Sequence, residues 1–408
     1  MQGSRRWDWV VRGLAVGLAL ALLARPAWLS DWALHVVGQC AVAVVACLGY
    51  QILLGQTGVL SLGQGLYAGL GAYAAICALR VPALMQVLPV AMLPLVGAAA
   101  GAGTGLVLGR LCARGRGVAP AMITLALAEL AWALALMLPQ LSGGDAGLSA
   151  NRDWPNQPLG WQWGPPHAAT LLVLAWAGLA WVVVGYAGRT PLWRLLGAVR
   201  DNPLRAAALG YDPIRLRWLG FVMAGGLAGL SGALGAILSE RVSPESLAWD
   251  KSAAVLMFSV LGGTTSRTGA LIGGILMATS ALVLPLSTPA WPLYLGLGFV
   301  LCVALLPQGL VSLAAPAQRQ RLRSLWQHGT GQRALWLVSL ALWGLAGALA
   351  LVSIEDFYAL QRSSELRETL LKKEQNTLFI QCMASALAAW SARSTWRRLG
   401  PKTAGGGF

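Results

Sequence analysis

Long apolar runs separated by short polar connectors make up most of the chain. A helix that crosses a bilayer needs about 20 apolar residues, and shorter runs serve where helices are broken or re-entrant. We expect such helices near residues 9–24, 33–54, 64–79, 86–109, 118–138, 168–187, 218–238, 252–263, 269–288 and 291–313, and two more near 334–353 and 377–392. The pattern therefore predicts an all-α polytopic membrane protein, a helical bundle of about 10 core transmembrane helices, some short or broken, plus about 2 C-terminal ones.

The run at 252–263 is too short to cross a bilayer alone, and glycines flank the polar turn that follows it. It could be a re-entrant half-helix, which would reverse the direction of all later helices. We prefer strict alternation, because it keeps Arg319, Arg321 and Arg323 in the cytoplasm, where basic loops are favoured.

Composition agrees with a membrane protein. Only 11% of the 408 residues are charged, whereas soluble domains carry about 25%. Most of the 30 lysines and arginines lie in connectors that alternation places on one side of the membrane. We therefore expect a cytoplasmic N-terminus, and we interpret the net charge of +15 as a sign of topology rather than of nucleic-acid binding.

Motifs of catalysis and of metal binding are absent from the sequence. There is no GxxxxGK[ST] phosphate loop, the six cysteines lie mostly in apolar runs, and the three histidines are far apart. We expect no catalytic residue, no metal site and no cofactor. Any work driven by ATP must then come from a partner subunit.

The connector at 198–210 has the pattern of a short capped helix in water. Asp201 and Asn202 can cap it, Pro203 suits its first turn, and Gly210 can end it. One interpretation is a helix that a cytoplasmic partner grips, and the other is an ordinary basic loop.

Four stretches of the chain resemble, in the same order, the LivM-type permeases, which are membrane subunits of bacterial ABC importers. The stretch that begins AVRDNPLRAAALG resembles their coupling loop. The others are Gly49–Ala75, Thr124–Glu129 with Ser142–Leu148, and Leu247–Gly274, so that the resemblance covers residues 30–315.

This resemblance implies a permease subunit in the bacterial inner membrane that moves branched-chain or related small amino acids from the periplasm to the cytoplasm. Its partners would be a second permease subunit in a heterodimer, two cytoplasmic ATPase subunits and a periplasmic solute-binding protein. The residues that would contact the ATPases are Arg200, Asp201, Asn202, Arg205, Ala206 and Gly210. The alternatives are a urea or short-amide permease of the same family, or a stand-alone secondary transporter or channel.

Polar residues within apolar runs are candidates for the substrate pathway. Glu129 is an acid at bilayer depth, and Thr124 precedes it by five positions. Gln56, Ser61 and Gln64 lie among glycines, and a lipid-facing glutamine would be costly. Glu129 could instead be a hydrogen-bonded helix-packing group, and the glycines could serve close packing alone. The family commonly carries a histidine at the position of Gln64, so the resemblance extends no proton-dependent role to this residue.

Three further segments complete the predicted organisation. Gly225, Gly229 and Gly232 share a helix face that suits tight packing. The long connector at 139–166 could dock the solute-binding protein or simply lie on the membrane surface. We expect a permease core at 1–316 and a C-terminal extension at 317–408, with one or two apolar helices and a basic tail.

Overall fold

The computed structural model describes residues 30–82, 85, 88–115, 117–153, 163–287, 291–305 and 309–311. The helices predicted near 9–24, 334–353 and 377–392, and the extension beyond residue 316, lie outside the described residues. The chain divides into two compact units, Met1–Leu282 and Val283–Phe408. The described helices of the second unit are α14 (Leu284–Ser287) and α15 (Trp291–Leu305).

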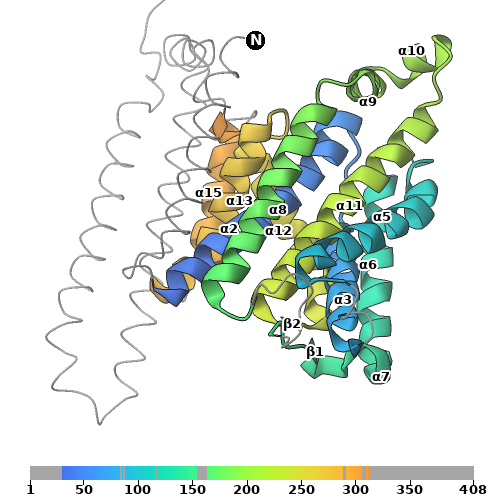
Figure 1. The fold of residues 1–408 in the computed structure, drawn as a ribbon. Helices are drawn as coiled ribbons and strands as arrows, with labels where there is room; N and C mark the ends of the chain where they lie inside the picture. Colours follow the sequence, from blue (N-terminus) through green and yellow to red (C-terminus); the bar gives the residue numbers. More distant parts are fainter. Residues whose placement is uncertain are drawn as a thin grey trace, which may run out of the picture. The chain divides into compact units, whose positions relative to one another are not determined.

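Helices make up nearly all of the described first unit (Figure 1). In chain order they are α2 (Asp31–Tyr50), the π-helix η1 (Gln51–Thr57), α3 (Gln64–Arg80), the 3-10 turn η2 (Val90–Met92), α5 (Leu93–Cys112), α6 (Ala119–Met137), α7 (Pro139–Ser142), α8 (Pro166–Ala187), α9 (Pro191–Asp201), α10 (Pro203–Ala208), α11 (Pro213–Ser239), α12 (Trp249–Gly262) and α13 (Arg267–Leu282). The short elements η3 (Gly144–Ala146), β1 (Leu148–Ser149), β2 (Arg241–Val242) and η4 (Pro244–Leu247) join them.

Within the described residues, five helical stretches are long and apolar enough to cross a membrane. They are Asp31–Thr57, Val90–Cys112, Ala119–Met137, Pro166–Ala187 and Pro213–Ser239. Helices α5 and α6 also expose large apolar side chains, among them Val107, Met122 and Met137, which suits contact with lipid or with another membrane subunit. The predicted all-α polytopic membrane fold is confirmed.

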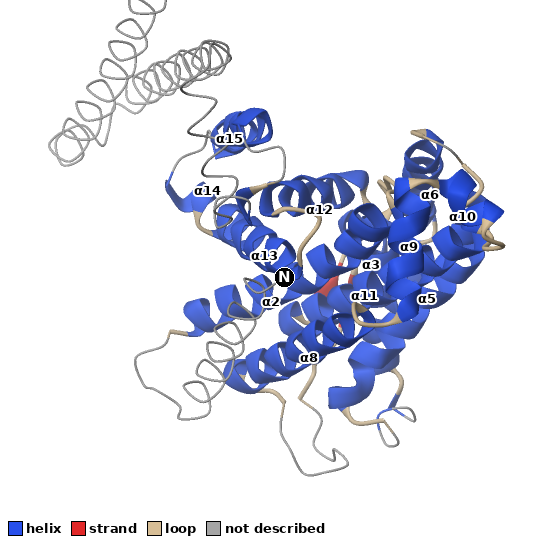
Figure 2. Ribbon diagram, turned by 90° about the horizontal axis from the view of Figure 1, so that it is seen from above, coloured by secondary structure: helices blue, strands red, loops and turns tan. Residues whose placement is uncertain are grey.

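Helix α11 lies among α3, α5 and α8 (Figure 2), and its glycines allow the close approach. Gly229 faces Gly97 of α5 and Gly71 of α3, so that a Cβ atom on Gly229 would overlap the Gly97 carbonyl oxygen. Gly232 lies against the backbone of Ala68 in α3. The tight packing predicted for this glycine face is confirmed, and backbone-to-backbone contact of this kind is how small residues join membrane helices.

The short helix predicted at 252–263 follows a segment that has already entered the bundle. In η4, just before α12, the Leu247 side chain fills the space beside Gly69 of α3. Helices α12 and α13 then form an antiparallel hairpin, in which Gly262 lies against the backbone of Gly269. Helix α12 has 14 residues and begins beside the first turns of α3, where η4 lies.

A buried arginine closes α11 at the end of the bundle opposite α9 and α10 (Figure 1). Arg152 donates hydrogen bonds from Nη1 to the carbonyls of Ile237 (3.0 Å) and Leu238 (3.1 Å) and pairs with Glu240 (3.3 Å). The last carbonyls of a helix lack partners within the helix. Arg152 therefore caps α11 and joins it to the segment that follows β1.

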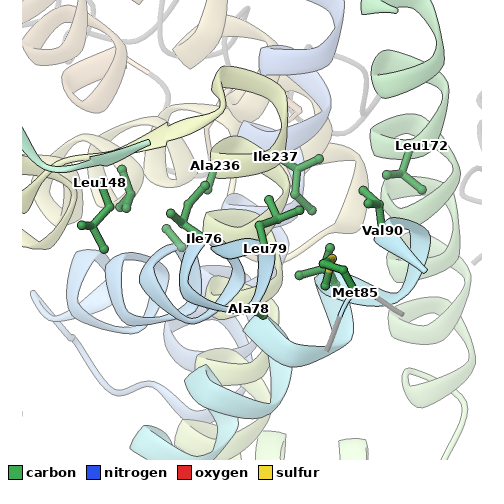
Figure 3. Packing of buried hydrophobic residues seen from close by; sticks show 12 residues of the cluster. Ile76, Ala78, Leu79, Met85, Val90, Leu148, Leu172, Ala236 and Ile237 are labelled. Atoms are coloured by element: carbon green, nitrogen blue, oxygen red, sulfur yellow. The ribbon is translucent and has the colours of Figure 1, made fainter. Parts of the chain in front are cut away.

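An apolar cluster lies at this same end. Figure 3 shows Ile76 and Leu79 of α3 beside Ile237 of α11, with Leu172 of α8 and Val90 of η2 farther along the cluster. Ile76 and Ile237 are completely buried. The cluster joins residues of α3, α8 and α11, which are distant in sequence, so it fixes where α3 and α8 meet α11.

The structure differs from the sequence expectation in one additional helix, α9, and in the start of α11. Helix α9 forms where we expected only a polar connector, because Leu192, Leu196 and Val199 recur at helical spacing and pack together. Helix α11 begins at Pro213 rather than near residue 218. The Asp212 carboxylate caps this start by accepting a hydrogen bond from the Ile214 N–H (2.9 Å).

The glycine contacts predict that alanine substitutions at two positions on α11, three residues apart, differ in their effect on stability. We expect Gly229→Ala to lower the free energy of unfolding by about 1–3 kcal/mol or more, because its Cβ must displace the α5 backbone. Gly226→Ala is the control, since its Cβ would lie an ordinary 3.5 Å from the Ala102 Cβ. Thermal unfolding in detergent measures both, and equal melting temperatures would contradict the packing.

Candidate functional site

Helix α2 does not continue regularly into the connector before α3. It changes at Gln51 into a π-helix that ends at Thr57, and Gly58 then adopts a left-handed conformation with φ of 69°. Residues 58–63 form an irregular segment, which we call the broken segment, and α3 begins at Gln64. Irregular backbone inside a membrane bundle is tolerated only where protein or a wet cavity satisfies its polar groups.

Three helices supply those partners for the broken segment and for the start of α3. The Tyr50 hydroxyl at the end of α2 donates to the Ser61 carbonyl (3.1 Å). The Thr124 hydroxyl of α6 accepts from the Leu62 N–H (3.0 Å). The Ser252 hydroxyl of α12 accepts from the Gly65 N–H (2.7 Å). Side chains from α2, α6 and α12 thus replace the hydrogen bonds that a continuous helix would have made.

Three of the predicted pathway residues meet at this place. Ser61, Gln64 and Thr124 are each at most 1% exposed. Thr124 is joined to the broken segment through Leu62, and Ser61 Oγ accepts from the Gly63 N–H (3.2 Å). Residues that are about sixty positions apart in the sequence are therefore direct neighbours in the fold.

The other two predicted pathway residues lie farther from this centre. Gln56 is half-buried near the end of the π-helix. Glu129 is half-buried on α6, five residues beyond Thr124, and its Oε1 atom is buried with no hydrogen-bond partner among the described residues. Among the described residues, neither Gln56 nor Glu129 is hydrogen-bonded to Ser61 or Gln64.

The Gln64 side chain is an unusual group in this interior. Both of its amide atoms are buried and have no hydrogen-bond partner within the described chain. The side chain lies beside Gly49 of α2, where an added Cβ would be 3.0 Å from Nε2. A buried polar group left without a partner costs about 1–3 kcal/mol. Gln64 therefore offers both a donor and an acceptor to any polar group that reaches it.

Sequence reasoning missed three residues of this site. Gln51 is 2% exposed, and its Oε1 atom has no hydrogen-bond partner in the part of the chain that the structure describes. A glutamine in the apolar run GYQILL was the signal that could have identified it. Tyr50 and Ser252 gave no such signal, because their importance depends on backbone groups supplied by other segments.

The predicted short helix in the polar connector is present as α10. The Asn202 side chain caps it by accepting from the Arg205 N–H (3.0 Å), Pro203 occupies its first turn, and Gly210 follows it with φ of 88°. Ala206 is its buried residue and packs with Leu196, Val199 and Leu216. Helices α9 and α10 and the start of α11 are thus joined through one small apolar cluster.

Arg200 and Arg205 lie on different sides of this connector. Arg205 is exposed on α10. Arg200, at the end of α9, donates from Nη1 to the Gly55 carbonyl of the π-helix and pairs with Asp201 (3.0 Å). The Arg200 side chain is still 37% exposed, but unlike Arg205 it also contacts the bundle.

The polar groups at this site can bind a solute through hydrogen bonds. Among the described residues, no group of three or more histidine, cysteine or acidic side chains could hold a metal ion. The buried polar atoms at the broken segment belong to amides and hydroxyls. Such groups recognise polar parts of a solute by hydrogen bonds without changing its covalent structure.

Comparisons with known proteins agree with this arrangement. The family model of the permease component of branched-chain amino acid transport systems matches residues 33–306. The chain is 28% identical over 324 residues to the high-affinity branched-chain amino acid transport system permease protein LivM of Salmonella typhimurium and to that of Escherichia coli, which covers 74% of this chain and 75% of each relative.

A more distant relative is the probable branched-chain amino acid transport permease protein LivH of Methanocaldococcus jannaschii. It is 28% identical over 244 residues, which is 58% of this chain and 75% of the relative. No solved structure matches the chain at a significant level. Because the family model covers most of the described helices, the chain belongs to the LivM-type family of branched-chain amino acid ABC transporter permeases.

Proposed function

We propose that this chain is the membrane-spanning subunit of an ABC importer that moves branched-chain or related small amino acids from the periplasm to the cytoplasm. It would lie in a bacterial inner membrane with its N-terminus in the cytoplasm. The names of the relatives support the transported class. The single observation that carries the proposal is the pair of exposed leucines on α10 and at its C-terminal end.

Helix α10 presents apolar side chains to solvent on a rigid support. Leu204 and Leu209 are 78% and 72% exposed, and Arg205 lies between them in the sequence. The Asn202 cap and the buried Ala206 hold this helix in place. Exposed apolar side chains on an ordered helix indicate a protein partner, because contact with that partner would remove them from water.

The partner that fits is an ATPase. The sequence has no phosphate loop of its own, and we propose that two cytoplasmic ATPase subunits receive α10 of this chain and the equivalent helix of a second, related permease subunit. A periplasmic solute-binding protein would deliver the amino acid. In this scheme Arg200, Asp201, Asn202, Arg205, Ala206 and Gly210 make or support the coupling contact, and the chain itself is not an enzyme.

The substrate pathway that we propose passes the broken segment. Ser61, Gln64 and Thr124 are its central residues, and Gln56 and Glu129 lie toward its borders. The unpartnered Gln64 amide supports this assignment, because a passing solute could bind both its donor and its acceptor. Which solute passes would depend largely on the binding protein, so the ligand of that protein tests the amino-acid class against urea or short amides.

The first test reverses one charge on α10. We expect Arg205→Glu to abolish ATP-driven uptake in vesicles that contain the full complex, because an acid then replaces the exposed base of the docking helix. Arg189→Glu makes the same charge change on an exposed residue before α9 and serves as the control. Both variants should insert normally in the membrane. Normal uptake by Arg205→Glu would count against the ATPase contact.

The second test removes the buried amide from the pathway. We expect Gln64→Leu to reduce uptake by about tenfold or more, since the loss of one hydrogen bond to a charged group of the solute costs about 1.5–3 kcal/mol. Gln39→Leu is the matched control, because Gln39 is a half-buried glutamine on α2, away from the proposed pathway, where it contacts His35. Uptake is measured at equal amounts of folded complex. If both variants transport like the wild type, Gln64 does not belong to the pathway.

A further inference from the structure

The end of the π-helix is held from outside by the α9–α10 connector. The helix that ends at Thr57 leaves its last carbonyls without partners in the following turn. The N–H of Val59, which could have reached the Gly55 carbonyl, bonds to the Leu53 carbonyl instead (3.2 Å). The Gly55 carbonyl receives Arg200 Nη1.

The shape of the π-helix end fits the arginine. Gly58 has no side chain, and an added Cβ would lie 2.6 Å from Arg200 Cγ. The guanidinium is further oriented by Asp201, whose Oδ1 accepts from Nε (3.1 Å) and pairs with Nη2 (3.0 Å). On the other side, a Cβ on Gly55 would overlap the Thr264 carbonyl in the turn between α12 and α13. The π-helix end is thus enclosed between α9 and that turn.

Arg200 therefore stands between two parts of the molecule. On one side, α9 is joined to α10 through Ala206, Leu196 and Val199. On the other side, the broken segment, which contains Ser61 and leads into Gln64 of α3, begins three residues after Gly55. A displacement of α10 would move α9, and the Arg200 hydrogen bond would carry that displacement to the backbone of the π-helix.

We propose that Arg200 is a positioning residue of transport, which links the coupling helix to the broken segment by holding the Gly55 carbonyl, rather than a residue that touches the ATPase. This inference rests on the proposed function, and it divides the two arginines of the connector by role. Arg205 would meet the partner from outside, and Arg200 would transmit its movement inside the permease.

The experiment measures uptake and ATP hydrolysis together, in vesicles that hold the full complex with its binding protein. We expect Arg200→Gln to lower the ratio of solute taken up to ATP hydrolysed by at least about fivefold, the lower end of typical coupling between sites. Arg200→Lys keeps a charged donor, so its ratio of uptake to ATP hydrolysis should lie between those of Arg200→Gln and the wild type. Gly58→Ala should reproduce the loss, because its Cβ occupies the place of Arg200 Cγ.

Arg194→Gln is the control, since Arg194 is exposed on the same helix, and it should keep the wild-type ratio. An unchanged ratio in Arg200→Gln overturns the inference. So does a proportional fall of uptake, ATP hydrolysis and melting temperature, because Arg200 would then only stabilise the fold. If the wild-type complex takes up solute without ATP, the proposed function fails instead, and the two failures are distinguished in one assay.

Discussion

The arrangement of this protein depends on how a broken backbone is satisfied inside an apolar bundle. Between the π-helix and α3 the chain leaves the regular helical pattern, and its polar groups must find partners where water is scarce. Tyr50, Thr124 and Ser252 supply those partners from three different helices. The conformation of the broken segment therefore depends on distant helices, because a movement of α6 or α12 would change the hydrogen bonds from Thr124 and Ser252.

Close helix packing gives this break a rigid surrounding. Glycines of α11 bring its backbone against α3 and α5, and Arg152 closes its far end. In the mechanism that we propose, the tightly packed helices keep their arrangement while the broken segment changes its conformation. Bundle cores of this density favour discrete arrangements rather than gradual deformation. We accordingly propose that the change of access occurs at the broken segment and that the α9–α10 connector moves it.

Local signals in the sequence predicted much of this fold, while contacts between distant segments escaped them. The cap, proline and glycine around 202–210 predicted α10 correctly, and the spacing of small residues predicted the packing face of α11. Ser61, Gln64 and Thr124 were identified as polar residues in apolar runs, and they are indeed buried. The contact of the Arg200 side chain with the π-helix could not be predicted, because the Gly55 carbonyl and Gly58 are far from Arg200 in the sequence.

We propose that ATP-driven movement of α9–α10 reaches the broken segment. Amide hydrogen exchange in the complete complex tests it most directly, because it reports local opening residue by residue. We predict that the amides of Leu62, Gly63 and Gly65 exchange at different rates in the nucleotide-free and ATP-bound complexes. The exchange rates of the α11 amides around Gly229, which pack against α5, should be the same in both states. Identical exchange at the broken segment in both states, with a clear change in α10, would contradict the account.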